Sequence, residues 1–145
     1  MRSIRDILRD KGGKVWSVTP DSSVFQALEL MAEKNIGALL VIDRGAIQGI
    51  ISERDYARKV ILKGRMSRTT RVTDIMTGNV LIVSPDQSVE ECMALMTDKR
   101  VRHLPVLENG ALLGMISIGD VVKAVIADKN YTIEQLQSYI TGSSR

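Results

Sequence analysis

Two short stretches of the chain end an apolar run with a serine and place an aspartate three residues later. They are ISERD, residues 51–55, and ISIGD, residues 116–120. A serine at the start of a helix can help to hold a phosphate, because the helix N-terminus presents amide groups and the positive end of the helix dipole. An ionised aspartate accepts hydrogen bonds through two oxygens, which suits the neighbouring hydroxyls of a ribose. The pairs Ser52–Asp55 and Ser117–Asp120 are therefore candidate nucleotide contacts.

The same spacing also has a purely structural explanation. A serine followed three residues later by Glu or Gln forms a capping box at the start of a helix, with no ligand involved. Asp is one methylene shorter than Glu, so we expect it to reach back to the first amide less readily. The spacing alone leaves both interpretations open, because serine caps are common and a four-residue motif is weakly specific.

The two motifs lie at matching points of an internal repeat. Residues 15–60 align with residues 80–125 without a gap, giving 18 identities in 46 positions. A unit this short lies below the size at which a domain usually folds alone, so each copy is expected to bury its apolar face against the other. We therefore expect one module of two halves related by an approximate twofold axis.

Each repeat follows the order strand, helix, strand, strand, helix, which predicts an α+β fold. The opening strands, residues 15–18 and 80–83, end at prolines that interrupt a ladder. The following helices carry apolar residues at i, i+4 and i+7, so the methionines among them, Met31 and Met96, are expected to fill the core. These apolar positions are Val24, Leu28 and Met31 in the first repeat and Val89, Met93 and Met96 in the second. The N-caps of these helices are predicted among four residues: Asp21 or Ser22 in the first repeat, and Asp86 or Ser88 in the second.

A hairpin is predicted in the second part of each repeat. The turns DRGA and ENGA separate the strands ALLVID and IQGIIS in one copy and HLPVLE and LLGMIS in the other. Gly49 and Gly114 occupy equivalent strand positions, where a missing side chain permits a bulge or the close approach of another backbone.

The flanking segments complete the predicted organisation. We expect an N-terminal helix and lead-in over residues 1–14, the repeats over 15–62 and 80–127, and a linker over 63–79. Residues 128–145 are predicted to form a C-terminal helix and tail, with Thr132 as N-cap and Gln135 three residues later.

Composition narrows the classes of function. The 145 residues are 44% hydrophobic and 26% charged, and the chain lacks an apolar run of about 20 residues, so we expect a globular protein that does not span a membrane. The first residues do not resemble a secretory signal, which favours a cytoplasmic location. Cys92 is predicted to be a buried, unreactive thiol. With one histidine and one cysteine, we expect neither a metal cluster nor a nucleophile with its base.

A nucleic-acid-binding surface is the alternative that the charges offer. Residues 63–71, KGRMSRTTR, form the most basic stretch, but they include no aromatic residue to stack on bases. Short charged runs between elements are usually solvated, and the net charge of +3 selects no ligand class.

Taken together, the repeats and motifs resemble a tandem pair of CBS domains, the regulatory modules named after cystathionine beta-synthase. The resemblance covers about residues 15–125 and rests on both V-x-P-D helix entries, both motif endings, and the lead TDIMT at residues 73–77. The segments RDIL and YTIEQLQSYI outside the repeats resemble those that frame the pair in small stand-alone members.

The resemblance implies two repeats that pack through their sheets and leave two clefts for adenosine-containing ligands such as AMP, ATP or NAD. It implies that the motif serines and aspartates line the clefts and that the start of the first hairpin strand approaches the base. Those strand positions are Gly37 and Ala38, and Arg102 and His103. Arg54 becomes a phosphate candidate, although Arg54 and Arg58 also suit a solvated surface. Its counterpart is Gly119, so the two clefts are expected to differ.

The function implied by this resemblance is regulatory binding without catalysis. We expect a homodimer that senses adenylate or redox state and acts on an unidentified partner protein. A nucleotide reservoir without a regulated partner stays open as an alternative.

Overall fold

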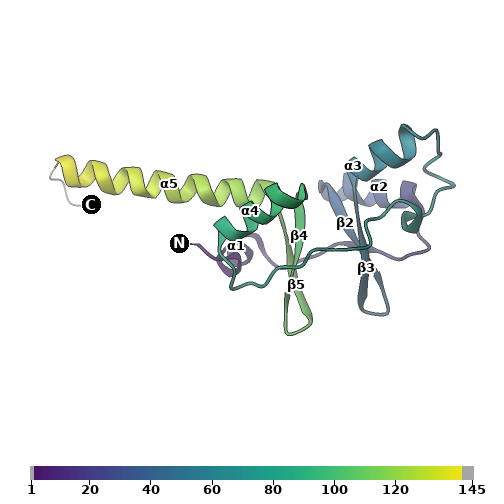
Figure 1. Cartoon of the computed structure of the whole chain (residues 1–145), viewed down its shortest axis with the longest axis horizontal. Coiled ribbons are helices and arrows are strands. Elements are labelled where there is room, and N and C mark those ends of the chain that lie inside the picture. Colours follow the sequence, from purple (N-terminus) through teal and green to yellow (C-terminus); the bar gives the residue numbers. More distant parts are fainter. Residues whose placement is uncertain (1, 142–145) are drawn as a thin grey trace. The chain divides into compact units, whose positions relative to one another are not determined.

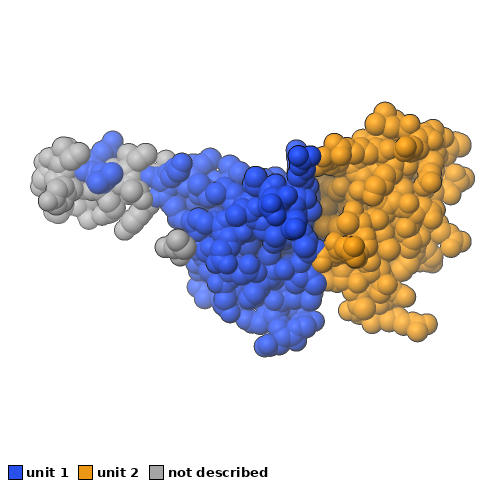
Figure 2. Space-filling view, viewed as in Figure 1, with its two compact units in different colours: residues 1–14, 81–145 blue, residues 15–80 orange. Residues whose placement is uncertain are grey.

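The computed structural model describes residues 2–141, apart from the side chains of residues 130–133, 135 and 138–141. The fold is α+β, as the repeat pattern predicts, and Figure 1 shows its elements. The chain divides into two compact units, coloured separately in Figure 2. One unit is residues 15–80, and the other joins residues 1–14 to residues 81–145.

The unit of residues 15–80 is built on a three-stranded sheet. The strands are β1 (Ser17–Val18), β2 (Ala38–Asp43) and β3 (Ala46–Ser52). β2 lies between the others, parallel to β1 and antiparallel to β3. The helices are α2 (Val24–Lys34), α3 (Glu53–Tyr56), the π-helix η1 (Ala57–Ile61) and the 3-10 helix η2 (Val72–Asp74).

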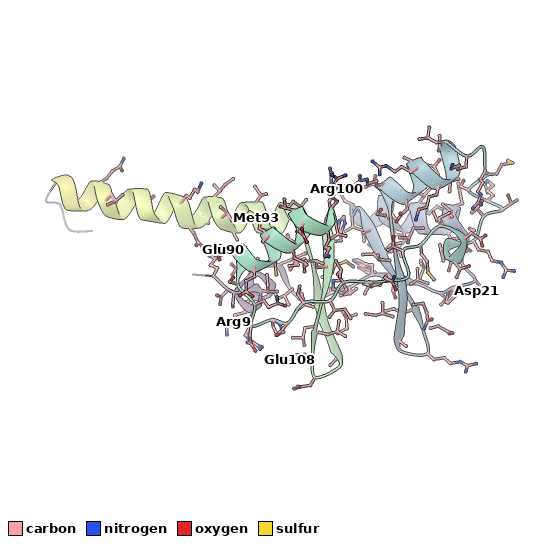
Figure 3. All side chains as sticks on the ribbon, viewed as in Figure 1. Arg9, Asp21, Glu90, Met93, Arg100 and Glu108 are labelled. Carbon is pink, nitrogen blue, oxygen red and sulfur yellow. The ribbon has the colours of Figure 1, made fainter. Side chains whose placement is uncertain are left out.

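The other unit pairs β4 (His103–Glu108) with β5 (Ala111–Ser117) in an antiparallel hairpin. Its helices are α1 (Ile4–Lys11), α4 (Val89–Lys99) and α5 (Ile118–Thr141). Arg100, labelled in Figure 3, ends α4 in the left-handed conformation with φ 54°.

The predicted opening strand at residues 80–83 is reduced to one parallel bridge between Val83 and Val106. The Val83 amide donates to the Pro105 carbonyl at 3.1 Å, and the Leu107 amide donates to the Val83 carbonyl at 3.0 Å. The next bond of a parallel ladder would need an N–H from Pro105, which has none. The residue equivalent to Pro105 in the first repeat is Leu40, which has an N–H, and there the two-residue strand β1 forms.

Both hairpins have the predicted tight turns. Arg44–Gly45 and Asn109–Gly110 have φ between 51° and 80°, as type I′ turns require. The strand register shifts beside the partners of Gly49 and Gly114, which confirms the predicted irregularity.

Two short segments outside the hairpins complete the cores. They are residues 3–8 (SIRDIL) and residues 71–76 (RVTDIM), and we call them the lead-in segments. They dock through equivalent backbone hydrogen bonds. Ile4 donates to the Gln87 carbonyl at 3.0 Å, and Val72 donates to the Ser22 carbonyl at 2.9 Å. Each lead-in segment therefore binds the residues that enter α4 or α2. The N-terminal one belongs to the unit of the second repeat, and the later one to the unit of the first.

Burial shows that the lead-in segments are part of the cores. Ile4 and Ile7 are buried with residues of α4, β4, β5 and α5, and Val72 and Ile75 are buried with α2, β2 and β3. A methyl group on Gly114 would lie 2.7 Å from Leu8 Cδ2, so the missing side chain admits the N-terminal lead-in segment. The predicted linker 63–79 thus ends in a packed segment.

Charged contacts also attach α1 to its unit. Arg5 pairs with Asp86 at 3.1 Å and closely with Glu108, which lies at the hairpin end of β4 (Figure 3).

Three sequence-based expectations about the helices meet the structure differently. The N-terminal helix is confirmed, with Ser3 as N-cap and Gly12 as C-cap. The N-cap of α2 is Ser23, not Asp21 or Ser22, because Ser23 forms a capping box with Gln26; the predicted Ser88 caps α4. The C-terminal segment is helical but starts no helix at Thr132, since α5 runs unbroken through it.

Buried residues match the predicted core of the repeats. Val24, Met31, Val89 and Met96 are buried, which confirms the methionines as core residues. Cys92 is buried too, and burial, aided by the charge of Glu91, raises the pKa of its thiol to about 11. A thiol so far from ionisation at neutral pH is a poor nucleophile. Within residues 2–141, no helix combines the length and apolar character needed to cross a membrane.

We predict that Ile75→Ala lowers the free energy of unfolding by about 2–5 kcal/mol, because it leaves a cavity in a packed core. Ile75 is 1% exposed, whereas Met66 of the same unit is 67% exposed. Met66→Ala is the control and should change stability by about 0.5 kcal/mol or less. Urea unfolding measures both, and equal effects would contradict the packing of the lead-in segment.

Candidate ligand-binding site

The two Ser-x-x-Asp motifs fold in the same way at a junction of strand and helix. Ser52 is the last residue of β3 and Ser117 the last of β5, and each aspartate lies in the first turn of the following helix. Each serine Oγ accepts a hydrogen bond from the aspartate amide at 3.2 Å. The predicted N-caps are therefore both present.

Each aspartate also returns a hydrogen bond to its serine. Asp55 Oδ2 accepts from the Ser52 amide at 3.0 Å, and Asp120 Oδ2 accepts from the Ser117 amide at 2.8 Å. The expectation that Asp reaches back poorly is wrong, because the extended backbone of Ser52 (φ −127°, ψ 164°) brings its amide close to the shorter side chain. Capping thus explains part of each motif.

Each carboxylate has a further partner, a lysine. Asp55 Oδ1 lies 3.2 Å from Lys59 Nζ, and Asp120 Oδ2 lies 2.6 Å from Lys11 Nζ. The aspartate side chains are only 15% and 22% exposed, so these pairs are partly shielded from water. A carboxylate can accept about four hydrogen bonds in all, so capping and one lysine do not exhaust it.

The environment of Asp120 favours its ionised form. Burial alone would raise the pKa of this carboxyl, but the hydrogen bond and charge of Lys11 and the hydrogen bond from the Ser117 amide outweigh burial and lower the pKa below its ordinary value. A carboxylate that stays charged in a half-buried position is a strong acceptor for hydroxyl donors.

The residues predicted to approach a base lie next to the motifs. In the β2–β3 ladder Ala38 is paired with Ser52, and in the β4–β5 ladder His103 is paired with Ser117. The Gly37 carbonyl accepts from the Glu53 amide at 3.1 Å.

The equivalent bond in the second motif joins the Arg102 carbonyl to the Ile118 amide at 2.8 Å. Two of the first three amides of each motif helix are therefore used within the protein: those of Glu53 and Asp55, and those of Ile118 and Asp120. The expectation of a helix start with its amides free for phosphate is wrong for these positions, which leaves a smaller backbone contribution to anion binding.

Basic side chains border both motifs. Arg54 and Arg102 are exposed, and His103 is partly buried. Burial lowers the pKa of His103, the charges of Lys11 and Arg102 lower it further, and Asp120 opposes them. The imidazole is therefore mainly neutral at pH 7, and Arg102 supplies the permanent charge beside this motif. In the first motif the exposed charge comes from Arg54. The equivalent position in the second motif is Gly119, which has no side chain.

Lys11 and Lys59 were not predicted as site residues. Lys11 lies 109 positions from Asp120 in sequence, and only the docking of α1 brings the two together. The similarity between SIRDIL and RVTDIM was the signal that could have placed α1 beside the second repeat.

The basic stretch at residues 63–71 is partly engaged inside its own unit. The Arg68 guanidinium lies 3.9 Å from the centre of the Phe25 ring, a cation–π contact. Thr70 is buried, and its hydroxyl donates to the Met66 carbonyl at 2.7 Å. These contacts reduce the surface that the nucleic-acid alternative requires.

We predict that Asp55→Ala lowers the free energy of unfolding of the ligand-free protein by about 0.5–2 kcal/mol, because it removes the return bond of a capping box. Asp55→Asn should lose less, since its amide oxygen can still accept from Ser52. Arg54→Ala, in the same helical turn, is the control and should leave stability nearly unchanged. Thermal unfolding compares the three variants, and an unaltered midpoint for Asp55→Ala would show that the cap contributes nothing.

Comparison with known proteins places this geometry in a family. The CBS domain model matches residues 3–62 and 72–127. The chain is 42% identical to the CBS domain-containing protein CBSX3, mitochondrial, of Arabidopsis thaliana, covering 97% of this chain and 72% of the relative. The structure of this chain superposes on that of a protein with CBS domains from Burkholderia ambifaria with a TM-score of 0.85. That structure shares 56% identity and covers 88% of this chain and 96% of its own.

A second solved structure shares the fold at lower identity. It is a CBS domain pair in complex with 5′-methylthioadenosine and S-adenosyl-L-methionine, 22% identical with a TM-score of 0.78, covering 88% of this chain and 98% of its own. The matched family model, the relatives and the paired motifs agree. The chain belongs to the CBS domain family and carries two copies of the domain.

Proposed function

We propose that this chain is a regulatory module that binds adenosine-containing ligands such as AMP, ATP or NAD at its two Ser-x-x-Asp motifs. The observation that carries the proposal is a partly buried, lysine-paired carboxylate in each repeat, next to the start of the first hairpin strand. The carboxylates would accept the ribose hydroxyls. Gly37 with Ala38, and Arg102 with His103, would contact the base.

The hydrogen bonds within the protein leave Asp120 room for a diol. Its Oδ2 takes the Ser117 amide and Lys11, so two of about four acceptor positions are used. The bonds to Asp55 come from the Ser52 amide, the Ser52 hydroxyl and Lys59. A ribose at Asp55 would displace the Ser52 hydroxyl, which can turn toward the ligand instead.

The comparison with a CBS pair that binds 5′-methylthioadenosine and S-adenosyl-L-methionine supports the class of ligand, since both compounds contain adenosine. The difference between Arg54 and Gly119 favours a phosphorylated ligand at the first motif, because a guanidinium is a strong phosphate partner.

Binding, rather than turnover, is the activity proposed here. The partners in each motif are a serine, an aspartate and a lysine that hold one another in a cap and an ion pair. A module of this kind would act by changing its own stability or contacts when a ligand binds. A regulated partner protein would read that change, and a nucleotide reservoir would need no partner. A cytoplasmic location stays a prediction, since the plant relative is named as mitochondrial.

We predict that Asp120→Asn weakens binding at the second motif by about ten- to a hundredfold, because hydrogen bonds to a charged group contribute about 1.5–3 kcal/mol. Asp55→Asn should do the same at the first motif, with the larger loss for ATP or NAD. Asn is used instead of Ala because it keeps an oxygen for the cap. Titration calorimetry with AMP, ATP and NAD measures each affinity, and chromatography should recover every nucleotide intact.

A matched control separates binding from folding. Gln26→Ala removes the capping box of α2, which shares no residue with either motif, and should lower stability without changing affinity. Wild-type protein that binds none of the three nucleotides would contradict the proposal, as would turnover above a buffer control. Equal losses in both Asn variants for every ligand would contradict the divergence of the motifs.

We also propose that the chain forms a homodimer. Ile61 and Ile126 occupy equivalent positions in the two repeats and are 56% and 53% exposed, an apolar surface that each copy leaves uncovered. A CBS-CP12 protein from bloom-forming cyanobacteria, 31% identical, is hexameric, so association occurs among related structures.

The dimer predicts a species of about twice 16.0 kDa in sedimentation at micromolar concentration. Ile61→Lys together with Ile126→Lys should shift the protein toward the monomer, because the charges would be buried on association. A wild-type sample that sediments only as a monomer would contradict this.

A further inference from the structure

Each motif aspartate is bound by a lysine that also holds a second segment of its unit. Lys59 Nζ pairs with Asp55 and donates to the Ile75 carbonyl at 2.9 Å. Lys11 Nζ bonds to Asp120 and donates to the Met115 carbonyl at 2.8 Å. In both units the ammonium therefore connects a lead-in segment, or the helix that contains it, to the motif.

The two lysines reach this arrangement from opposite directions. Lys59 belongs to η1, which follows the motif, and reaches out to the lead-in segment of residues 71–76. Lys11 belongs to α1, which begins within the other lead-in segment, and reaches in to the motif. The repeat places Ala124 at the position of Lys59, so the second motif has no lysine of its own there. Lys11 supplies the missing charge from another part of the chain.

The aligned lead-in segments show the same exchange. Continued three residues beyond the lead-in segments, the alignment places Lys11 opposite Asn79, so no lysine follows the later segment at that place, and Lys59 is present instead. Two positions could place a lysine beside the motif, one after the lead-in segment and one in the helix after the motif. Each unit has a lysine at only one of these two positions, and that lysine contacts the motif carboxylate. Two unrelated positions that give one contact argue for a shared role rather than a chance surface pair.

The chemistry of the contact suits a link between ligand and lead-in segment. An ammonium group has three donors, and the contacts above use two of them. The carboxylate is held in one orientation by the serine amide and the lysine together, so it is ready to receive two hydroxyls. A ligand that covers the carboxylate excludes water from the Asp–Lys pair, which strengthens the attraction between the two charges. The lysine in turn holds the lead-in segment.

A cavity gives direct access to the contact in the second unit. Its volume is about 260 Å³, and it lies between α1 and α5. Lys11 and Asp120 line it together with Lys123, over a floor that includes Ile7 and Ala124. Part of a bound molecule could therefore lie against the Lys11 ammonium.

We propose that Lys11 and Lys59 are positioning residues that couple ligand binding at each motif to the docking of the attached lead-in segment. The ligand-coupling part rests on the proposed function. Occupancy at Asp120 would stabilise α1, and occupancy at Asp55 would stabilise residues 71–76. The N-terminal helix thereby becomes the element that reports the state of the second motif.

The test uses Lys11→Met and Lys59→Met in the full chain, since Met keeps the length of the side chain without its charge. One readout needs no ligand. The protein has one histidine, and the charges facing it come from Lys11, Asp120 and Arg102. Lys11→Met should raise the pKa of His103 in a proton NMR titration, because a positive charge that opposes protonation is gone. Lys59→Met is the matched control and should leave that pKa unchanged.

Two further readouts address coupling. Amide hydrogen exchange of residues 4–11 should slow when AMP or ATP is added to the wild type, and Lys11→Met should abolish this added protection. The exchange of residues 72–76 should also slow when the nucleotide is added to the wild type. Lys59→Met should abolish this protection of residues 72–76 and leave that of residues 4–11. Calorimetry should show about tenfold weaker binding at the affected motif, the loss expected for one misplaced charged partner. Lys11→Arg should recover part of the affinity.

The outcomes separate the coupling from the proposed function. Wild-type protein that binds no nucleotide overturns the function and the ligand coupling together, while the His103 titration still decides whether Lys11 holds its place in solution. Wild-type protein that binds, with lysine variants that bind equally well and keep ligand-dependent protection, overturns the coupling and leaves the function standing. An unchanged pKa of His103 in Lys11→Met overturns the Lys11 contact itself.

Discussion

Each unit of this chain completes its core with a lead-in segment, and the rest of the structure depends on that docking. Ile4 and Ile7 in one unit, and Val72 and Ile75 in the other, are buried among the helices and strands of a repeat. The segment SIRDIL precedes the first repeat in sequence but packs with the second. Apolar burial of this kind contributes about 1.5–3 kcal/mol for each large side chain, so the lead-in segments are a major part of each small core.

The glycines of the hairpins make this docking possible. A methyl group on Gly49 would lie 2.6 Å from Met76 Sδ and 2.9 Å from the Thr77 carbonyl oxygen, too close for either to stay in place. Gly114 has the same relation to Leu8. In the second unit the docking of α1 also brings Lys11 to Asp120, whereas Lys59 reaches Asp55 from four residues along the chain. Core packing and the electrostatics of the second motif therefore have one structural origin.

The sequence predicted the features that local patterns determine. The hairpins, the paired motifs and the α+β order of the repeats follow from residue types and spacing within short windows. The sequence also explains why the opening strand of the second repeat is short, because Pro105 lacks the N–H donor that a longer ladder needs. The continuous α5 was missed because Thr132 and Gln135 resemble a capping box, although no glycine or proline interrupts residues 121–141.

Long-range docking was beyond those patterns. Nothing near Asp120 in sequence indicates Lys11, and the contact exists because α1 packs beside α5 and β5. The spacing Ser-x-x-Asp suggests either a helix cap or a ligand contact. One carboxylate can do both, because it accepts hydrogen bonds through different lone pairs. The cap holds Asp55 and Asp120 in place, and the remaining acceptor capacity is what a ligand would use.

Ligand contact at the motif aspartates can be tested with a crystal structure of the chain grown with AMP and ATP. We expect ribose hydroxyls within about 3 Å of the Asp55 or Asp120 carboxylate, with the serine caps intact at the backbone and Lys11 or Lys59 still bound to the same aspartate. Nucleotide bound elsewhere, with both aspartates contacting only their own serines and lysines, would contradict this expectation.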